Sequence, residues 1–202
     1  MKLFEHPEFE QALLRAAERY ELTEQFIEKD YWITQILSVV ANQLGEHIIF
    51  KGGTSLSKGW GLITRFSEDI DLFLNPQSYT PPPGRKRRDR ILRDLASQVA
   101  AHPGLTRSAD EGRVIGGLSR EDYFAYTSRF QALPELRPVV RLEPGIQSGS
   151  FPTQDATISC LVGDYLREER LGNLAATTTG GRRSSAVRRT SGGRRRTGGG
   201  GK

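Results

Sequence analysis

Apolar residues recur every three or four positions along three stretches of the chain. Residues 8–20 carry apolar side chains at helical spacing, and residues 23–44 repeat the pattern, with Thr23 placed to cap the second helix. A third stretch, residues 85–101, follows three prolines and a glycine and begins with four basic residues. The pattern predicts three amphipathic helices.

Short apolar runs between and after these helices predict strands. Residues 48–50 are apolar and lead into two glycines, while residues 69–74 alternate aspartate with apolar side chains before the strand is closed by an Asn-Pro pair. Residues 123–130 and 139–142 are also β-like, and a helix is expected from Thr54 to about residue 60. Helices before and between strands predict an α+β fold with α/β character, in which helices flank a small mixed sheet.

The end of the chain has a different composition. Residues 172–202 contain nine glycines, seven arginines and one lysine but no acidic residue, so their formal charge is +8. The whole chain carries a net charge of +5, which leaves 5 − 8 = −3 for residues 1–171. Such a segment cannot bury enough apolar surface to offset its ordering entropy. We therefore predict a core over residues 1–170 and a disordered Arg/Gly-rich tail over residues 171–202. The tail is interpreted either as a phosphate-binding arm or, from its abrupt start, as a frameshifted end.

Several classes of protein are disfavoured. No apolar run approaches the ~20 residues of a membrane span, and the first residues lack a signal-peptide pattern, so a cytoplasmic protein without membrane contact is expected. A single cysteine and three scattered histidines give neither a disulfide nor zinc-ligand spacing. Cys160 is expected to be a buried small hydrophobe, and Trp32 and Trp60 to pack in the core.

The residues after the first predicted strand are suited to holding phosphate. Gly52 and Gly53 permit close approach of the backbone to an anion, and Thr54 or Ser55 can donate a hydroxyl hydrogen bond. Lys58, one turn further on, can neutralise a β- or γ-phosphate. The spacing is not that of a P-loop. The stretch therefore predicts a nucleotide-binding turn of another kind.

Two aspartates on the following strand predict a metal site. Asp69 and Asp71 share one face of a strand, because successive side chains point to opposite sides. Mg²⁺ suits two such carboxylates together with substrate phosphates, and a third carboxylate would complete a two-metal site. Glu143, at the end of the 139–142 run, is the best candidate for that third ligand, with Asp122 and Asp155 as alternatives.

These motifs together resemble a known family. Gly-Gly-Thr-Ser at 52–55 followed by Asp-Ile-Asp at 69–71 is similar to the signature of the polymerase-β-like nucleotidyltransferases. More narrowly, residues 50–58, 65–72 and the lead-in 28–32 resemble the AbiEii/AbiGii toxin family over roughly residues 20–170. That family also has a helical carboxy-terminal half where this chain has its tail, which suggests an atypical or truncated carboxy terminus.

The resemblance implies transfer of a nucleoside monophosphate from a nucleoside triphosphate, with Mg²⁺, onto an acceptor. It assigns Asp69 and Asp71 to metal and catalysis, Ser55 or Thr54 to the triphosphate, and adds Lys58 and Arg65 to the nucleotide-binding residues; Glu143, proposed above from its place in the sequence, completes the predicted catalytic and metal-binding set. Some relatives modify the 3′ end of tRNA, so the expected protein is an RNA-modifying toxin of a toxin-antitoxin or phage-defence system with a cognate antitoxin. A catalytically impaired homologue that binds nucleotide or RNA is the alternative, and a small-molecule nucleotidyltransferase of the antibiotic-modifying kind is a third hypothesis.

Overall fold

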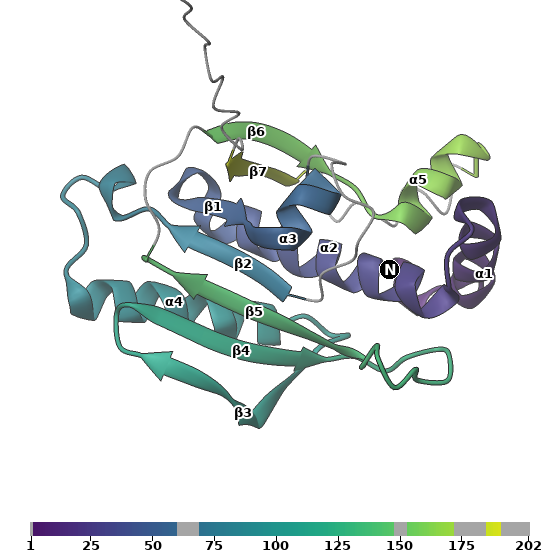
Figure 1. The fold of residues 1–202 in the computed structure, drawn as a ribbon, viewed down its shortest axis with the longest axis horizontal. Helices are drawn as coiled ribbons and strands as arrows, with labels where there is room; N and C mark the ends of the chain where they lie inside the picture. Colours follow the sequence, from purple (N-terminus) through teal and green to yellow (C-terminus); the bar gives the residue numbers. More distant parts are fainter. Residues whose placement is uncertain (1, 60–68, 148–152, 172–184, 191–202) are drawn as a thin grey trace, which may run out of the picture.

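The computed structural model describes residues 2–59, 69–147, 153–171 and 185–190 and shows a mixed sheet with helices packed behind it (Figure 1). Its strand order is β3-β4-β5-β2-β1-β7-β6. Helices α2 and α4 lie behind the sheet, and the described helices leave the front of β2, β5 and β4 uncovered. The predicted α+β fold is confirmed. The elements are β1 (Ile48–Lys51), β2 (Asp69–Leu74), β3 (Thr106–Ile115), β4 (Ser119–Ala125), β5 (Val139–Gly145), β6 (Thr153–Ile158), β7 (Ser185–Thr190), α1 (Phe9–Tyr20), α2 (Glu24–Leu44), α3 (Gly52–Thr54), α4 (Arg85–Ala100), α5 (Leu161–Glu168), a π-helical turn (Ser55–Gly59) and 3₁₀ turns at Leu3–Glu5, Gly45–His47 and Pro76–Ser78.

The three predicted amphipathic helices are present with nearly the predicted bounds. Thr23 is the N-cap residue of α2, although its side chain makes no capping hydrogen bond. The apolar faces of α1, α2 and α4 join one buried cluster with the sheet, and Trp32 within it is only 2% exposed. Cys160 is also buried, as predicted. No helix among the described residues is long and apolar enough to cross a bilayer.

Strand β2 has the predicted alternation of faces. Ile70 and Leu72 are fully buried against the helices, whereas Asp69 and Asp71 are partly exposed on the uncovered face. β2 pairs antiparallel with β1, which places Lys51 opposite Asp71. The two aspartates of this strand therefore point away from the core, which fixes the position of the strand.

Strand β5 joins β2 from a distant part of the chain. The two strands are parallel, with Asp71 opposite Glu143 and Asp69 opposite Arg141. A parallel pair needs a long crossover connection, and here it contains α4 and the β3–β4 hairpin. β4 then pairs antiparallel with the other side of β5 and places Tyr123 opposite Arg141.

Some predicted bounds differ from the observed ones. The run at 123–130 corresponds to β4, which ends at Ala125, because the following residues leave the sheet to bond with Glu28 on α2. The helix expected from Thr54 begins earlier, at Gly52, and becomes π-helical from Ser55. Strands β3 and β6 and helix α5 were not predicted. The two strands are rich in polar residues, so apolar alternation does not mark them.

Six residues of the basic tail form a strand. Ser185–Thr190 lie between β1, to which they are parallel, and β6, to which they are antiparallel. For these six residues alone the structure differs from the predicted disorder, because strand pairing on both sides satisfies their backbone hydrogen-bonding groups. The other tail residues, 172–184 and 191–202, and Trp60 lie outside the described residues.

Candidate active site

The glycine turn at the end of β1 lies directly against one of the predicted metal ligands. Gly52 has a φ of +76°, in the region that favours glycine, and a Cβ placed on it would lie 2.0 Å from Asp71 Oδ2. No other residue fits without moving that carboxylate. The turn and the aspartate are therefore one structural unit, although 18 residues of chain separate them (53 to 70).

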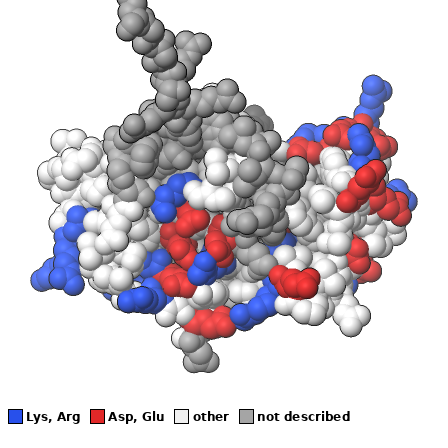
Figure 2. All heavy atoms as spheres, in the orientation of Figure 1, with Lys and Arg blue, Asp and Glu red and all other residues white. Residues whose placement is uncertain are grey.

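The three predicted carboxylates lie on the same face of two adjacent strands. Asp69 and Asp71 project from β2, and the parallel register places Glu143 of β5 beside Asp71. Glu121 of β4 adds a fourth carboxylate, since it lies on the same face of its strand as Tyr123. Figure 2, which views this face, shows acidic side chains near its centre with basic side chains close by.

Arg141 lies among these carboxylates. Its Nη2 and Nε donate to Asp69 Oδ2 and Oδ1 at 2.5 and 3.0 Å, in the forked geometry typical of an arginine–carboxylate pair. Nε is also 2.8 Å from Glu143 Oε1, and Nη1 is 3.4 Å from Glu121 Oε1. One guanidinium thus contacts three of the four acidic side chains.

The charges on this face do not balance. Lys51, whose Nζ is 3.9 Å from Asp71 Oδ1, and Arg141 contact the four carboxylates, and Arg113, opposite Glu121 in register, adds a third positive charge, so these seven side chains carry a net charge of −1. Burial raises the pKa of Glu143; Arg141 opposes that rise, whereas Asp71 and the other nearby carboxylates add to it. The pKa of Arg141 is raised, chiefly by its hydrogen bonds to Asp69. A further cation is therefore favoured electrostatically at this position.

Two shallow pockets flank the carboxylates. A pocket of about 240 Å³ is lined by Asp71 and Glu143 together with Lys51 and two arginines, Arg113 and Arg120. A second pocket, of about 210 Å³, is lined by Asp69, Tyr123, Arg137, Val139 and Arg141. Both combine carboxylates with basic side chains, so each offers contacts to a metal-bound or phosphorylated ligand.

The hydroxyls predicted to hold phosphate are buried. Thr54 and Ser55 are each 1% exposed, and their hydroxyls donate to the backbone carbonyls of Asp69 and Phe50, at 2.6 and 3.1 Å. The Thr54 bond ties the turn to the first residue of β2. In this structure the two hydroxyls fix the shape of the turn, and phosphate contact from this segment would come from its backbone.

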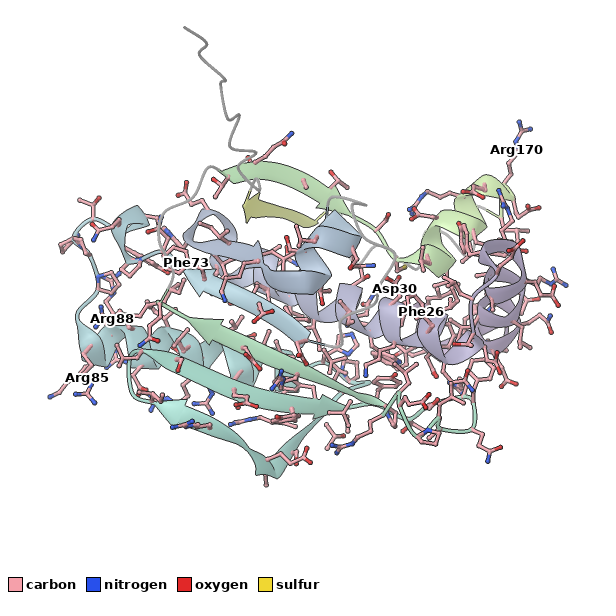
Figure 3. All side chains as sticks on the ribbon, viewed as in Figure 1. Phe26, Asp30, Phe73, Arg85, Arg88 and Arg170 are labelled. Atoms are coloured by element: carbon pink, nitrogen blue, oxygen red, sulfur yellow. The ribbon has the colours of Figure 1, made fainter. Side chains whose placement is uncertain are left out.

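Lys58 also lies away from the carboxylates. Its Nζ is 2.5 Å from Asp30 Oδ1 on α2, and both side chains are at least 90% buried. The other oxygen of Asp30 accepts a hydrogen bond from Leu161 N at 2.7 Å, so Asp30 connects the glycine turn to the start of α5 (Figure 3). Arg65 lies outside the described residues.

The alternative third ligands do not join the site. Asp122 is 2% exposed on the opposite face of β4, where it pairs with Arg107 and Arg120 at 2.6 and 2.5 Å. Asp155 lies on β6, at the far edge of the sheet. Of the three candidates, only Glu143 lies beside Asp71.

Sequence reasoning missed Arg141 and Glu121 as members of the site. A signal for Arg141 was present: it lies two residues before Glu143 in a strand-like run, so the two side chains must share a face. Glu121 gave no comparable signal, because its place depends on how β4 pairs with β5.

The donor chemistry fits a hard cation such as Mg²⁺, since Asp69, Asp71 and Glu143 offer carboxylate oxygens on adjacent strands. As the side chains are arranged, however, Arg141 lies between them. Among the described residues, no group of three acidic, histidine or cysteine side chains converges closely enough to hold a metal. Asp71 and Glu143 face each other most directly and would contribute first.

A glycine turn at the end of one strand, packed against an Asp-x-Asp pair on its antiparallel neighbour, is the arrangement expected from the resemblance to the polymerase-β-like nucleotidyltransferases. Residues 35–177 match the family described as nucleotidyl transferase AbiEii toxin of type IV toxin–antitoxin systems. Because that match spans well over half of the 202 residues, the chain belongs to this family. No curated protein matches the sequence.

Proposed function

We propose that this protein is a Mg²⁺-dependent nucleotidyltransferase that transfers a nucleoside monophosphate from a nucleoside triphosphate to RNA, such as tRNA. The observation that carries the proposal is the joint position of the glycine turn, Asp71 and Glu143. The turn comes within contact distance of Asp71, and the parallel register sets Glu143 beside it. Backbone for phosphate and oxygens for metal therefore lie together.

Asp69, Asp71 and Glu143 are assigned to the metal. When bound, Mg²⁺ would polarise the phosphate and offset the charge that develops during transfer. Lys51 is the basic residue that pairs with Asp71 among the residues that the structure describes, so its ammonium group is placed to bind a phosphate oxygen on that side. The predicted nucleotide-binding set, Gly52, Gly53, Thr54, Ser55, Lys58 and Arg65, remains a prediction, in which Thr54 and Ser55 act by fixing the turn.

The reaction joins an acceptor hydroxyl oxygen to the α-phosphorus and breaks the bond between that phosphorus and the bridging oxygen. Pyrophosphate leaves, and the hydroxyl proton passes to water or to a carboxylate. The two pockets lie on either side of the carboxylates, with Asp71 and Glu143 lining one and Asp69 the other. One is available to the triphosphate and the other to the acceptor.

The biological setting follows from the family. A toxin of a type IV toxin–antitoxin system has a cognate antitoxin, and we include such a partner in the proposal. Nucleoside triphosphates and tRNA are cytoplasmic, so we place the activity there.

A second function is favoured by one observation. Arg141 already compensates Asp69 and Glu143, as expected of a homologue that binds nucleotide or RNA without transferring a nucleotide. Such a protein would retain nucleotide binding and salt-dependent RNA binding but show no turnover.

The test is incubation of the purified chain with each α-³²P-labelled nucleoside triphosphate, Mg²⁺ and total bacterial RNA. The variants Asp69→Asn and Asp71→Asn keep the side-chain shape and remove the charge. Asp89→Asn, an exposed carboxylate on α4, is the matched control. Label on RNA with the wild type and the control, and none with the two site variants, supports transfer. Label that persists in both site variants would refute it, and nucleotide binding without label favours the second function.

A further inference from the structure

Arg141 occupies the carboxylate oxygens that a metal ion would need. Both oxygens of Asp69 accept hydrogen bonds from its guanidinium, and Glu143 Oε1 is 2.8 Å from Nε. Among the residues that the structure describes, Asp71 has no ion pair or hydrogen bond to Arg141, and its ion-pair partner is Lys51, whose Nζ lies 3.9 Å from Asp71 Oδ1. The guanidinium therefore blocks one side of the carboxylate group and leaves the other open.

The position of Arg141 is set by the backbone. It projects from β5 between Asp69 on one neighbouring strand and Tyr123 on the other, directly opposite each in register. Tyr123 donates its hydroxyl to Glu121 Oε1, the same oxygen that Arg141 Nη1 approaches at 3.4 Å. A side chain held in this way returns to the carboxylates whenever no other cation is present, at the high local concentration of a tethered group.

We propose that Arg141 is a tethered counter-cation that competes with a divalent metal for Asp69 and Glu143 and so sets the metal affinity of the site. This inference rests on the proposed function, which assigns these carboxylates to the metal. Arg141 is a positioning residue in this scheme. It stabilises the metal-free site and lowers its affinity for a divalent ion.

The test is Mn²⁺ binding to the full chain without nucleotide, measured by the electron paramagnetic resonance signal of free Mn²⁺. Removing the competing charge in Arg141→Gln is expected to tighten binding by about tenfold, as for the loss of one strong charge-assisted contact. The thermal midpoint of the metal-free variant should fall, and Mn²⁺ should raise it more than in the wild type, because binding to the folded state stabilises that state.

Arg93→Gln is the matched control, because Arg93 is an exposed arginine that pairs with Asp89 on α4. It should bind Mn²⁺ as the wild type does. Equal or weaker Mn²⁺ binding by Arg141→Gln would overturn the proposal. So would tight binding that survives when Asp69→Asn and Asp71→Asn are added to Arg141→Gln, because the ion would then lie elsewhere.

If circular dichroism shows that Arg141→Gln does not fold, Arg141→Lys decides the question. Lysine keeps the charge but lacks the planar fork that holds Asp69, so its Mn²⁺ affinity should exceed that of the wild type. Equal or lower affinity would overturn the proposal. The outcome is separate from the transfer assay: a chain that shows the Mn²⁺ effect but labels no RNA refutes the proposed function alone, and a labelling chain without the effect refutes only the role of Arg141.

Discussion

The buried ion pair between Lys58 and Asp30 is expected to stabilise the glycine turn, and Lys58→Met is the perturbation that tests it. The two side chains are 9% and 7% exposed and their charged atoms are 2.5 Å apart. Replacing the lysine leaves the Asp30 carboxylate buried, and among the described residues its remaining hydrogen-bond donor is Leu161 N–H. Breaking a buried pair on one side costs about 3–5 kcal/mol, and we expect a loss in that range.

The double variant separates the pair from its surroundings. Asp30→Asn is nearly isosteric and its amide oxygen can still accept from Leu161 N, but alone it leaves the lysine charge unpaired, at a similar cost of about 3–5 kcal/mol. With both changes neither position carries a buried charge, so the loss should be only about 1–2 kcal/mol, that of one unsatisfied amide. The coupling energy should therefore amount to several kcal/mol.

The assay is urea unfolding at pH 7, followed by far-ultraviolet circular dichroism, for the wild type, both single variants and the double variant. Arg93→Met removes an exposed i,i+4 pair partner on α4 and should cost no more than about 0.5 kcal/mol. Losses that simply add in the double variant would refute the pairing. If instead Lys58→Met were as stable as the wild type and failed only to bind nucleoside triphosphate, Lys58 would act on phosphate, as its sequence position predicts.

Three further predictions concern the turn and the core. Gly52→Ala should destabilise the protein by at least about 1 kcal/mol and abolish nucleotide transfer, because it combines a strained φ with a clash against Asp71, whereas Gly116→Ala, which meets only ordinary contacts, should do neither. Burial lowers the pKa of His102 to about 4, so the stability that its neutral form contributes is complete above about pH 6.5. As the pH falls from 6.5 to 4 the free energy of unfolding should decrease, by at most about 3 kcal/mol. The variant His102→Gln should flatten this part of the dependence of urea unfolding on pH, and an unchanged dependence would contradict the prediction. The Cys160 thiol, whose pKa burial raises to about 11, should resist iodoacetamide at pH 8 in the folded protein and react in urea, and rapid labelling of the folded chain would contradict its burial.

Local patterns were sufficient to predict the elements that carry the site. The apolar run before Gly52 and the alternation around Asp69 and Asp71 identify β1 and β2, since both depend on residues close in sequence. The pairing of β2 with β5 is different. It joins residues about 70 positions apart, and the proximity of Arg141 to Asp69 follows from the parallel register, which no local pattern contains.

The surroundings of Lys58 show a second limit of sequence reasoning, although its assignment to phosphate remains a prediction. Its assignment to phosphate assumed α-helical spacing after the glycines, but Ser55–Gly59 form a π-helical turn. A π turn has more residues per turn than an α-helix, so side chains after Ser55 point in directions that a period of 3.6 does not give. The partner, Asp30, is one of three consecutive charged residues in a helix predicted to pack in the core, and that contradiction was the available signal.

Those three residues explain how the site can be open and still well defined. Glu28, Lys29 and Asp30 are at most 5% exposed, and each bonds to a different segment. Glu28 accepts a hydrogen bond from Arg129 N at 3.0 Å, and Lys29 donates one to Arg137 O at 2.9 Å. Helix α2 therefore holds both ends of the connection from β4 to β5. Asp30 binds the glycine turn and the start of α5. Because buried, paired charges are costly to separate, α2 fixes the strand carrying Arg141 and Glu143 and the turn beside Asp71 from behind the sheet. The proposed exchange of partners between the charges on this face and a metal or a phosphate would then leave the fold intact.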